Sequence, residues 1–556
     1  MKQLIPLIVT KKKVAGFIKK NIKPLFLLFF TWGMYFALFW PRMLYSNKTG
    51  DLVAGWRNIW GDWAMHITQA HAFAYQPILH VLQNHPIYSG IPLSYPFTFN
   101  LISGLLLRLG VNTVSAFIIP SLIVSFFLLF GLYILGKHLT GSSRQTLLAV
   151  TLFLTSGGLG FIHYFKDLAQ NFSLKTALYP PHEYTHMKDI GYYWTTTLLA
   201  HLVPQRAFLL GMTFGLFILY FLFSYYQKSF KDVSLAKMLS LGLVSGLLAY
   251  IHNHTLAMLF FLSAYLFLFD LKHYKHWLSF ALGTSVSALP FFIFFSGPDY
   301  SQYIQFLPGW LSHPRELNIP FWWFWLKNWG LMIPLFIVGM FVGKQKPKTG
   351  LFISGFIFIF LLANLFTFQP SSWDNAKLLL WVYLIFSFVV AGFLLTLWEK
   401  HLGGKILAAL LFLCLTASGG IDLVRVLNTQ KESYMMVSGQ EIELAKFLRE
   451  HSKPKDIVLT SDNHLHWVPL ASGRSIVMGY RGWLWSHGIN YNQRQKDITQ
   501  IYRGTPQAKT LLQKYNIRFV VTDRKTQEEL MSNEKFFKEN YHILIASPYG
   551  NVYEIK

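Results

Sequence analysis

The chain has 556 residues, of which 53% are hydrophobic, 17% aromatic and only 13% charged, with a formal net charge of +24. Soluble domains are about one quarter charged, so this composition excludes an ordinary soluble protein and, with apolar runs of bilayer-crossing length recurring from Pro24 to Leu427, indicates a polytopic membrane protein. The excess of cations does not indicate nucleic acid as a partner, because the lysines and arginines lie in short loops between apolar segments.

The apolar segments predict eleven to thirteen transmembrane helices. A basic N-terminus, 1–23, precedes the first of them and lacks a small-residue cleavage site, so we expect a retained signal-anchor. The expected spans are 24–45, 113–136, 145–164, 207–226, 238–252, 255–270, 277–296, 323–342, 351–368, 378–397 and 405–426. Segment 97–110 is short and contains Arg108. We expect it to be re-entrant or interfacial, although a full crossing would change the parity of the topology.

The Lys/Arg-rich loops are expected on the cytoplasmic side. The membrane core, 24–427, then has four long outer segments, and everything after it lies outside the cytoplasm. These outer segments are 46–96, 166–206, 297–322 and 369–377. The first of them reads as one or two helices lying at the membrane surface.

The last part of the chain, 428–556, changes composition and predicts a small extracytoplasmic α/β domain. Runs of β-branched residues alternate with helical patterns there. The expected strands are 456–460, 475–478, 517–522 and 542–546, and the expected helices are 441–450, 493–503 and 506–515. Cys414 is the single cysteine, which excludes a disulfide or a cysteine metal site within the chain.

Asp62 and His66 form the first candidate catalytic pair. They are four residues apart, so a helix would place them on one face. A carboxylate there can take a proton from an attacking hydroxyl, with His66 as its orienter, a phosphate contact or a second base. A solvated surface helix with an ordinary acid is the simpler interpretation of the same spacing.

A wider pattern surrounds this pair. A first apolar helix is followed by an outer segment with an acid near its start, and then Tyr95-Pro96-Phe97-Thr98 leads into the short run ending Leu107-Arg108-Leu109-Gly110. This pattern resembles the GT-C superfamily of polytopic glycosyltransferases that use polyprenyl-phosphate sugars. The resemblance implies that Asp62 is the catalytic acid of the first outer segment. Many members have paired acids, whereas Trp63 follows Asp62 here, which argues against a metal-dependent mechanism.

The second outer segment supplies further candidates for substrate binding. Glu183 lies among three histidines in the run 179–186, and His201, Gln205 and Arg206 follow at the start of a helix. Imidazole and carboxylate groups can bind metals, but no zinc-site spacing is present. We expect the segment to fold over an active-site cavity. Arg206 is either a phosphate ligand or a snorkelling residue at a helix end.

Two more polar groups interrupt the apolar core. His252-Asn253-His254 lies in a tight helical hairpin, where His252 and His254 either contact substrate or join helices. Asp374, Asn375 and Lys377 lie between two spans, where the first two can hold sugar hydroxyls and the lysine can pair with a lipid phosphate. A plain turn with Trp373 at the membrane interface is the alternative.

The tail offers one loop, 479–488, in which Arg481 and Trp483 stand between glycines. Aromatic faces stack on sugars and arginine binds phosphate, so this loop can contact substrate. A docking surface between the tail and the membrane core is an equally good interpretation.

The resemblance to the GT-C superfamily therefore implies a glycosyltransferase of the plasma membrane that moves a sugar from a polyprenyl-phosphate donor to a glycan, lipid or protein acceptor outside the cytoplasm. Asp62 acts as the general base in a single, inverting displacement. No cofactor or metal is required, although a divalent cation is compatible. The alternatives are a lipid-linked glycan polymerase or ligase, and a transporter or flippase of lipid-linked sugars, whose charges would lie near the bilayer midplane.

Overall fold

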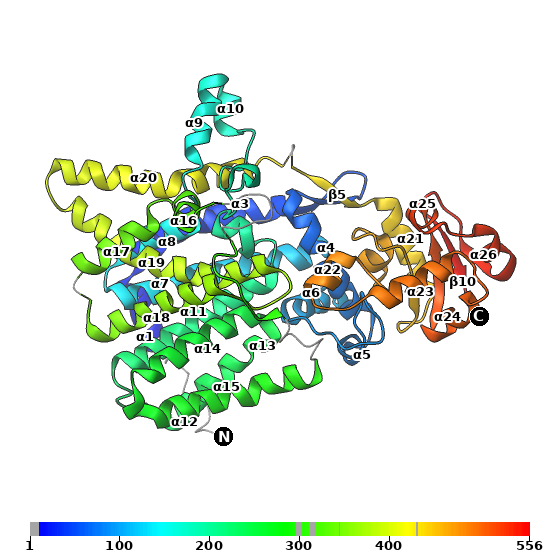
Figure 1. The fold of residues 1–556 in the computed structure, drawn as a ribbon, viewed down its shortest axis with the longest axis horizontal. Coiled ribbons are helices and arrows are strands. Elements are labelled where there is room, and N and C mark those ends of the chain that lie inside the picture. Colours follow the sequence, from blue (N-terminus) through cyan, green and yellow to red (C-terminus); the bar gives the residue numbers. More distant parts are fainter. Residues whose placement is uncertain (1–10, 296–302, 312–318, 344, 430–431, 556) are drawn as a thin grey trace. The chain divides into compact units, whose positions relative to one another are not determined.

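A computed structural model describes residues 11–295, 303–311, 319–343, 345–429 and 432–555 (Figure 1). These residues divide into two compact units. The bundle unit takes its residues from 1–40, 121–289 and 303–431, and the sheet unit takes its residues from 41–120, 290–302 and 432–556.

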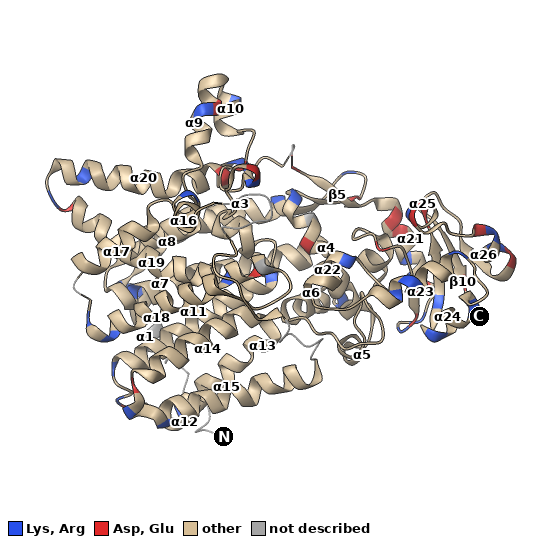
Figure 2. Cartoon of the chain, viewed as in Figure 1, with Lys and Arg blue, Asp and Glu red and all other residues tan. Residues whose placement is uncertain are grey.

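Seven helical segments of the described chain are long and apolar enough to cross a bilayer. Charged residues are sparse along them, as Figure 2 shows. The chain is therefore a multi-pass membrane protein. The segments are α2 (Ile22–Leu28) with η1 (Phe29–Gly33) and α3 (Met34–Met43), α7 (Thr113–Thr140), α11 (Arg206–Gln227), η4 (Leu271–His273) with α15 (Tyr274–Phe294), α18 (Pro347–Leu365), η6 (Ser372–Asn375) with α19 (Ala376–Trp398), and α20 (Leu402–Arg425).

The expected span at 145–164 is corrected by the structure. It consists of two helices, α8 (Ser143–Leu154) and α9 (Phe161–Gln170), with non-helical residues between them. Gly158 in this break has no room for a side chain, because a Cβ there would lie 1.6 Å from the backbone oxygen of Lys327. Gly158, which lies in the break after α8, thus allows a close backbone contact that a residue with a side chain would prevent.

Three other expected spans are also modified. The span at 323–342 is a pair of helices, α16 (Phe321–Trp329) and α17 (Met332–Val342), bent by 86° at a break of at most four residues. Gly330 in the break has φ +58°, a left-handed conformation that favours glycine. The spans at 238–252 and 255–270 are shorter apolar helices, at Leu235–Ile251 and Asn253–Leu268. They comprise α12 (Leu235–Gly246) with α13 (Leu248–Ile251), and α14 (Asn253–Leu268).

Helix α19 is the central helix of the bundle unit. Its residues from Ala376 to Ala391 are all buried, and it packs against α8, α17, α18 and α20. A helix that is apolar on every side is typical of such a position. The remaining described elements of this unit are α1 (Lys11–Lys20), α10 (Leu174–Leu178), η2 (Lys188–Ile190), η3 (Leu198–Leu202), and the antiparallel pair β3 (Gln305–Phe306) and β4 (Phe366–Thr367).

The sheet unit contains a five-stranded sheet of order β7-β6-β8-β10-β9. Strand β6 is parallel to β7 and β8, whereas β10 is antiparallel to β8 and β9. The four strands expected in the tail are confirmed, and β10 was missed because a four-residue strand after a turn gives little pattern. The strands are β6 (Ile457–Leu459), β7 (Ser475–Ile476), β8 (Ile517–Thr522), β9 (His542–Ile545) and β10 (Asn551–Glu554).

Helices surround this sheet, and the three expected in the tail are confirmed as α21, α23 and α24. Helix α21 begins with a capping box, in which the Ser438 hydroxyl accepts from the Glu441 backbone N–H and the Glu441 carboxylate accepts from that of Ser438. The helices are α21 (Gly439–Glu450), η7 (Val468–Ser472), α22 (Arg481–Ser486), α23 (Asn492–Tyr502), α24 (Ala508–Lys514), α25 (Arg524–Leu530) and α26 (Glu534–Asn540).

The sheet unit also contains the whole of the first outer segment, a grouping that the sequence did not indicate. Strands β1 (Leu44–Ser46), β2 (Leu52–Ala54) and β5 (Tyr434–Val437) form a second, antiparallel sheet of order β1-β2-β5. Helices α4 (Arg57–Tyr75) and α5 (Ile78–Gln83) follow. The expectation of surface helices fails for α4, because its residues from Trp63 to Ala74 are buried.

The short segment 97–110 forms α6 (Thr98–Arg108), which packs on α4. The helices approach closely at Gly104, where a Cβ would lie 2.5 Å from the Cβ of Phe73. Arg108, which looked out of place in a crossing, donates from Nη2 to the carbonyl oxygens of Phe73 and Gln76 at 2.7 and 2.6 Å. It thereby satisfies backbone groups that the end of α4 leaves open.

Candidate functional site

The bundle unit places one buried ion pair at the start of its central helix. Lys377 Nζ lies 2.8 Å from Asp374 Oδ1, and the side chains are only 8% and 20% exposed. Gln205 Nε2 donates to the same carboxylate oxygen at 3.3 Å. The structure thus brings together three of the residues predicted to bind substrate, across a sequence separation of about 170 positions.

His201 extends this group from η3, a π-helical turn. Its ring is 1% exposed and stacks on Trp373 at 5.8 Å between centroids. Burial, and then the charge of Lys377, lower the pKa of His201 to about 3. The imidazole is therefore neutral at physiological pH, and neither Nδ1 nor Nε2 has a hydrogen-bond partner within the described chain. π-Helical turns are frequent at functional sites, and a buried polar ring without partners is costly unless a ligand satisfies it.

The histidines at the start of α14 adjoin this group. His252 Nδ1 accepts from the backbone N–H of Thr255 at 3.2 Å and so caps the helix. Its ring lies 4.7 Å from Phe208 and 5.4 Å from His254, between centroids. The Nε2 atom of His252 is buried and has no partner among the described residues. A role in helix capping is therefore shown for His252, and one ring nitrogen remains available.

Arg206 and Asn375 are held by the protein itself. Arg206, the first residue of α11, is fully buried, and its Nε donates to the Ser121 hydroxyl at 3.4 Å. Burial excludes the snorkelling interpretation, which requires the guanidinium to reach water. Asn375 Nδ2 donates to the carbonyl oxygen of Phe366 at 2.5 Å. This bond ties η6 to β4, and the amide oxygen of Asn375 is buried without a hydrogen-bond partner among the described residues.

Glu183 makes its contacts elsewhere. Its carboxylate lies 3.5 Å from Arg425 Nη1 and 3.8 Å from His186 Nδ1. The next two residues, Tyr184 and Thr185, donate their backbone N–H groups to Asp422 at 2.8 Å each. These contacts fasten the run to the end of α20. The substrate-binding role of Glu183 stays a prediction.

No group of three or more His, Cys, Asp or Glu side chains in the described ranges is arranged to hold a metal ion. Asp422 receives a third hydrogen bond, from the Thr185 hydroxyl at 2.6 Å. Asp422, an acid within the expected span 405–426, therefore accepts three hydrogen bonds from residues 184 and 185.

In the sheet unit, Asp62 and His66 lie one turn apart on α4, as the spacing predicted. Asp62 is partly exposed, whereas His66 is 1% exposed. The Asn100 amide nitrogen on α6 lies 3.1 Å from His66 Nδ1 and donates to Gln69 Oε1 at 2.7 Å. Because an amide nitrogen only donates, His66 Nδ1 accepts and the ring proton sits on Nε2.

A series of aromatic rings continues from His66. Tyr95 lies 6.1 Å from the His66 ring and stacks on His487 at 4.7 Å. The ring of His85 follows at 6.4 Å from His487. Sequence reasoning did not predict that Asn100 and Tyr95 contact His66, or that His487 stacks on Tyr95. Asn100 gave a signal, since it is a polar residue inside an otherwise apolar run.

Arg481 and Trp483 contact other tail residues. Arg481 Nε donates to Asp462 Oδ2 at 2.5 Å, and Lys525 Nζ lies 2.8 Å from the other oxygen of that carboxylate. Trp483 packs edge-on against Tyr480 at 5.5 Å. The guanidinium of Arg481, which was predicted to meet a substrate phosphate, thus pairs with an acid of the same domain.

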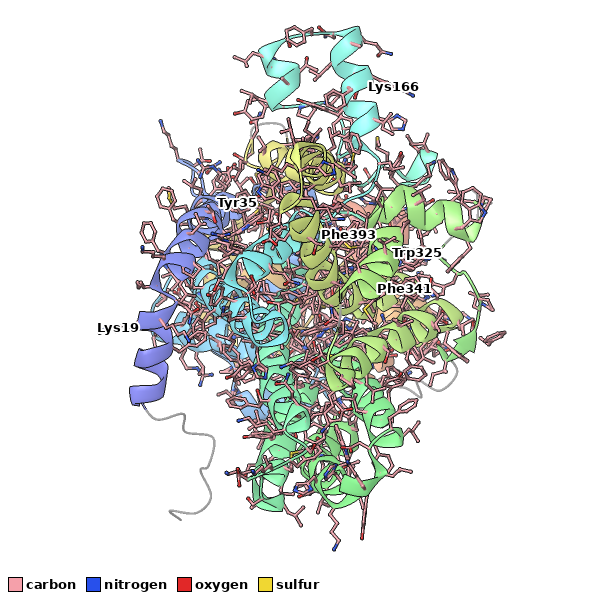
Figure 3. The ribbon with its side chains drawn as sticks, turned by 90° about the vertical axis from the view of Figure 1, so that its left-hand side faces the viewer. Lys19, Tyr35, Lys166, Trp325, Phe341 and Phe393 are labelled. Atoms are coloured by element: carbon pink, nitrogen blue, oxygen red, sulfur yellow. The ribbon has the colours of Figure 1, made fainter. Side chains whose placement is uncertain are left out.

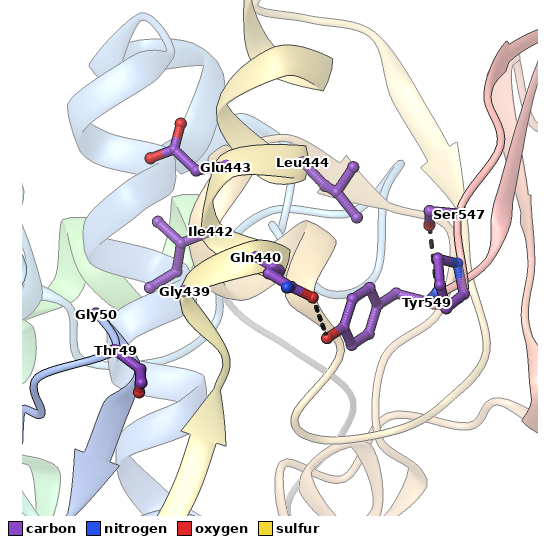
Figure 4. A pocket seen from close by; sticks show the side chains of 10 residues that line it. Thr49, Gly50, Gly439, Gln440, Ile442, Glu443, Leu444, Ser547 and Tyr549 are labelled. Carbon is purple, nitrogen blue, oxygen red and sulfur yellow. Dashed lines mark hydrogen bonds between the residues drawn. The ribbon is translucent and has the colours of Figure 1, made fainter.

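An open groove of about 550 Å³ lies elsewhere in the sheet unit. Figure 4 shows its lining, which includes a hydrogen bond of 2.7 Å from the Tyr549 hydroxyl to Gln440. None of the predicted site residues lines this groove. Its residues are Thr49, Gly50, Gly439, Gln440, Ile442, Glu443, Leu444, Ser547, Pro548 and Tyr549.

These elements define a multi-pass helical membrane protein that carries an α/β tail. No family model and no curated relative matches the chain. Among solved structures, it is similar to ArnT from Cupriavidus metallidurans bound to undecaprenyl phosphate, with 10% identity, a TM-score of 0.48 and coverage of 97% of this chain and 98% of that one. It is also similar to the Archaeoglobus fulgidus oligosaccharyltransferase AglB in complex with an inhibitory peptide and a dolichol-phosphate. That comparison has 12% identity, a TM-score of 0.45 and coverage of 92% and 71%.

Proposed function

We propose that this protein is a membrane glycosyltransferase that moves one sugar from a polyprenyl-phosphate donor to an acceptor outside the cytoplasm. The observation that carries the proposal is the group at the start of α19. Lys377, Asp374 and Gln205 are joined by hydrogen bonds there, beside a buried neutral His201 whose ring nitrogens have no partner within the described chain.

This group has the chemistry that a lipid-linked sugar phosphate needs. The ammonium of Lys377 can share its charge between Asp374 and a phosphate oxygen, because it has three donor hydrogens. His201 offers one donor and one acceptor to sugar hydroxyls, and Trp373 presents an aromatic face. The apolar helices around α19 suit a polyprenyl chain.

Asp62 is the proposed general base. It takes the proton from the acceptor hydroxyl or amine while that atom forms its bond to the anomeric carbon. The bond from the anomeric carbon to the phosphate oxygen breaks, and polyprenyl phosphate leaves with the electron pair. One displacement inverts the anomeric centre. A cation beside the leaving phosphate stabilises the charge that develops on it.

His66 is proposed to orient the base. It lies on the same face of α4 as Asp62, and Asn100 fixes its tautomer so that its remaining N–H is a donor. Transfer requires no metal in this scheme, because a lipid phosphate is a good leaving group. The acceptor is a glycan, a lipid or a protein.

The test is transfer of radiolabelled sugar from a polyprenyl-phosphate donor in membranes that contain the wild type or Asp62→Asn. We expect the substitution to lower transfer by about 10²- to 10⁴-fold, the usual contribution of a general base. Asp189→Asn is the matched control, since Asp189 is an exposed acid in η2. Normal transfer by Asp62→Asn at equal expression rejects the assignment.

The same membranes distinguish the two alternatives. A flippase moves the intact lipid-linked sugar across vesicles without forming a glycosidic bond, and a polymerase or ligase transfers a preassembled glycan instead of one sugar. Thin-layer separation of the labelled lipid and product reports which bond has formed.

A further inference from the structure

Helices α9 and α10 form a hairpin with an apolar surface that no other described element covers. Large hydrophobic side chains cluster on it, and the two near its tip, Phe172 and Leu174, are 85% and 76% exposed. Ile162 and Phe165 are three residues apart on α9 and so share one face. The exposed set is Ile162, Phe165, Phe172, Leu174, Leu178 and Tyr179.

The hairpin is built as a fixed element. The Tyr164 hydroxyl on α9 donates to the carbonyl oxygen of Ala177 on α10 at 2.9 Å. The Tyr184 hydroxyl donates to Asp167 on α9 at 2.5 Å. Its exposed apolar side chains therefore project from a braced scaffold.

Both ends of the hairpin are attached to one membrane-crossing helix, α20. At the start of α9, the backbone N–H of Phe161 donates to the Ser418 hydroxyl at 2.8 Å. After the end of α10, the carbonyl oxygen of Pro180 accepts from Arg425 Nε at 3.0 Å. Ser418 and Arg425 are seven residues apart, which corresponds to about 10 Å along a helix. Both attachments thus fall within the last two turns of α20, where its apolar length ends.

The direction of the hairpin follows from the views of the bundle unit. In Figures 1 and 3, α9 and α10 project sideways from α20, across the direction of the long helices and not along it. The surface beside its base is also apolar and open, since Leu413 and Val424 on α20 are 57% and 47% exposed. The hairpin thus continues the exposed apolar surface of α20 near the end of that helix.

The exposed charges of the hairpin are cationic. Lys166 and Lys175 are exposed, and Lys166 extends away from the ribbon in Figure 3. The one acid of the two helices, Asp167, accepts from Tyr184 and so is engaged within the protein. Lysines beside exposed aromatic and aliphatic side chains are typical of helices at a membrane surface that contains anionic lipids.

We propose that the α9–α10 hairpin is a lipid-binding element that lies in the interface of the same bilayer that the bundle crosses. Its apolar side chains enter the boundary between headgroups and acyl chains, and Lys166 and Lys175 contact anionic headgroups. This interaction is independent of the proposed transfer reaction, because none of the hairpin residues belongs to the groups around Asp374 or Asp62.

The experiment uses the single cysteine of the chain. Cys414→Ala provides a background in which Phe172→Cys and Leu174→Cys carry an environment-sensitive fluorophore, in the full-length protein reconstituted into phosphatidylglycerol/phosphatidylethanolamine vesicles. Phe341→Cys on α17, at a residue that is 86% exposed, is the lipid-facing control. Lys535→Cys on α26, with a side chain that is 83% exposed, is the water-facing control.

We expect labels at 172 and 174 to be quenched by lipids that carry a spin label near the headgroup and to be protected from iodide, unlike the label at 535. Lys166→Gln with Lys175→Gln is expected to weaken this lipid quenching in anionic vesicles and to leave it unchanged in neutral ones. Iodide quenching at 172 and 174 equal to that at 535 overturns the proposal. Protection from both quenchers also overturns it, because the hairpin would then be covered by protein.

Discussion

Lys377 and Asp374 form an ion pair whose burial the sequence did not reveal. The pair is only three residues apart, so the sequence could predict that the two side chains meet. It could not predict that both lie largely out of water, which follows from the burial of α19 on every side. A charge so placed needs its partner, because removal of one member leaves the other uncompensated.

We expect Lys377→Met combined with Asp374→Asn to raise the KM for the lipid-linked donor about tenfold or more while the protein still folds. The double change removes both charges together, so no buried ion is left alone, but the phosphate loses its cation. Lys405→Met is the control, at an exposed lysine of α20. Donor kinetics in purified protein provide the measurement, and an unchanged KM argues against a phosphate at Lys377.

His201 offers a second test at this scale. Its ring stacks on Trp373 while both nitrogens are buried without partners in the described chain. A phenylalanine keeps the stacking and removes the unsatisfied polar atoms, which cost roughly 1–3 kcal/mol each. We therefore expect His201→Phe to raise the melting temperature of the ligand-free protein and to lower transfer activity.

The contrary result for His201 would be a loss of stability together with full activity. In that case the ring nitrogens would serve the fold and not a ligand. His201→Gln, which retains a donor and an acceptor, is expected to recover part of the activity but not the gain in melting temperature.

At the scale of elements, α4 and α6 depend on each other. Arg108 on α6 caps the carbonyl end of α4, and Asn100 on α6 holds His66 on α4. Gly104 allows the approach, because a Cβ there would lie 2.8 Å from the backbone oxygen of Ala70. The position of Asp62, the candidate base on α4, therefore depends on the packing of α6.

Gly104→Ala tests this dependence. The added methyl group meets backbone and Cβ atoms that cannot rotate away, so we expect a destabilisation of about 1–3 kcal/mol and a loss of transfer at temperatures where the protein is still folded. Gly420→Ala on α20 is the matched control, since nothing lies within 4 Å of its Cβ position. Thermal unfolding and activity are measured on both variants, and equal behaviour of the two would disprove close packing at Gly104.

Helix α4 also predicts a sensitivity to acid. His71 Nδ1 lies 3.2 Å from the Ala471 carbonyl oxygen and Nε2 lies 3.0 Å from the Thr113 hydroxyl. Burial lowers the pKa of His71 to about 4. The pKa of His71 in the folded protein is below the ordinary value of about 6.5. The contribution of neutral, buried His71 to folding stability is therefore fully present above pH 6.5 and is lost as the pH falls through 4.

The shift corresponds to about 3 kcal/mol at most. His71→Gln, which is neutral at every pH, should flatten the fall in melting temperature between pH 7 and pH 4.5 relative to the wild type. An identical pH profile for the two proteins would show that His71 does not carry the acid sensitivity.

For the whole molecule, the sequence predicted the local elements better than their grouping. Four tail strands and three tail helices were expected from alternation and periodicity, and they are present. The association of the first outer segment with the tail rests on contacts such as Gln76 to Gly473 and Arg494 to Ser89, about 400 residues apart. Local sequence patterns cannot predict contacts between residues so far apart in the chain. The same limit applies to the site, where the stacking of His201 on Trp373 was not predictable although both residues were named.

Topology is the last expectation that concerns the entire chain. Cationic loops such as 228–237 predict one side of the membrane, and the α/β tail is expected on the other. In the Cys414→Ala background, we expect Lys535→Cys in the tail to react with an impermeant maleimide in intact cells, and Lys231→Cys to react only after lysis. Both positions are exposed, so access depends on the membrane and not on the fold. The opposite pattern would place Asp62 and the tail in the cytoplasm. The proposed transfer outside the cytoplasm would then be rejected.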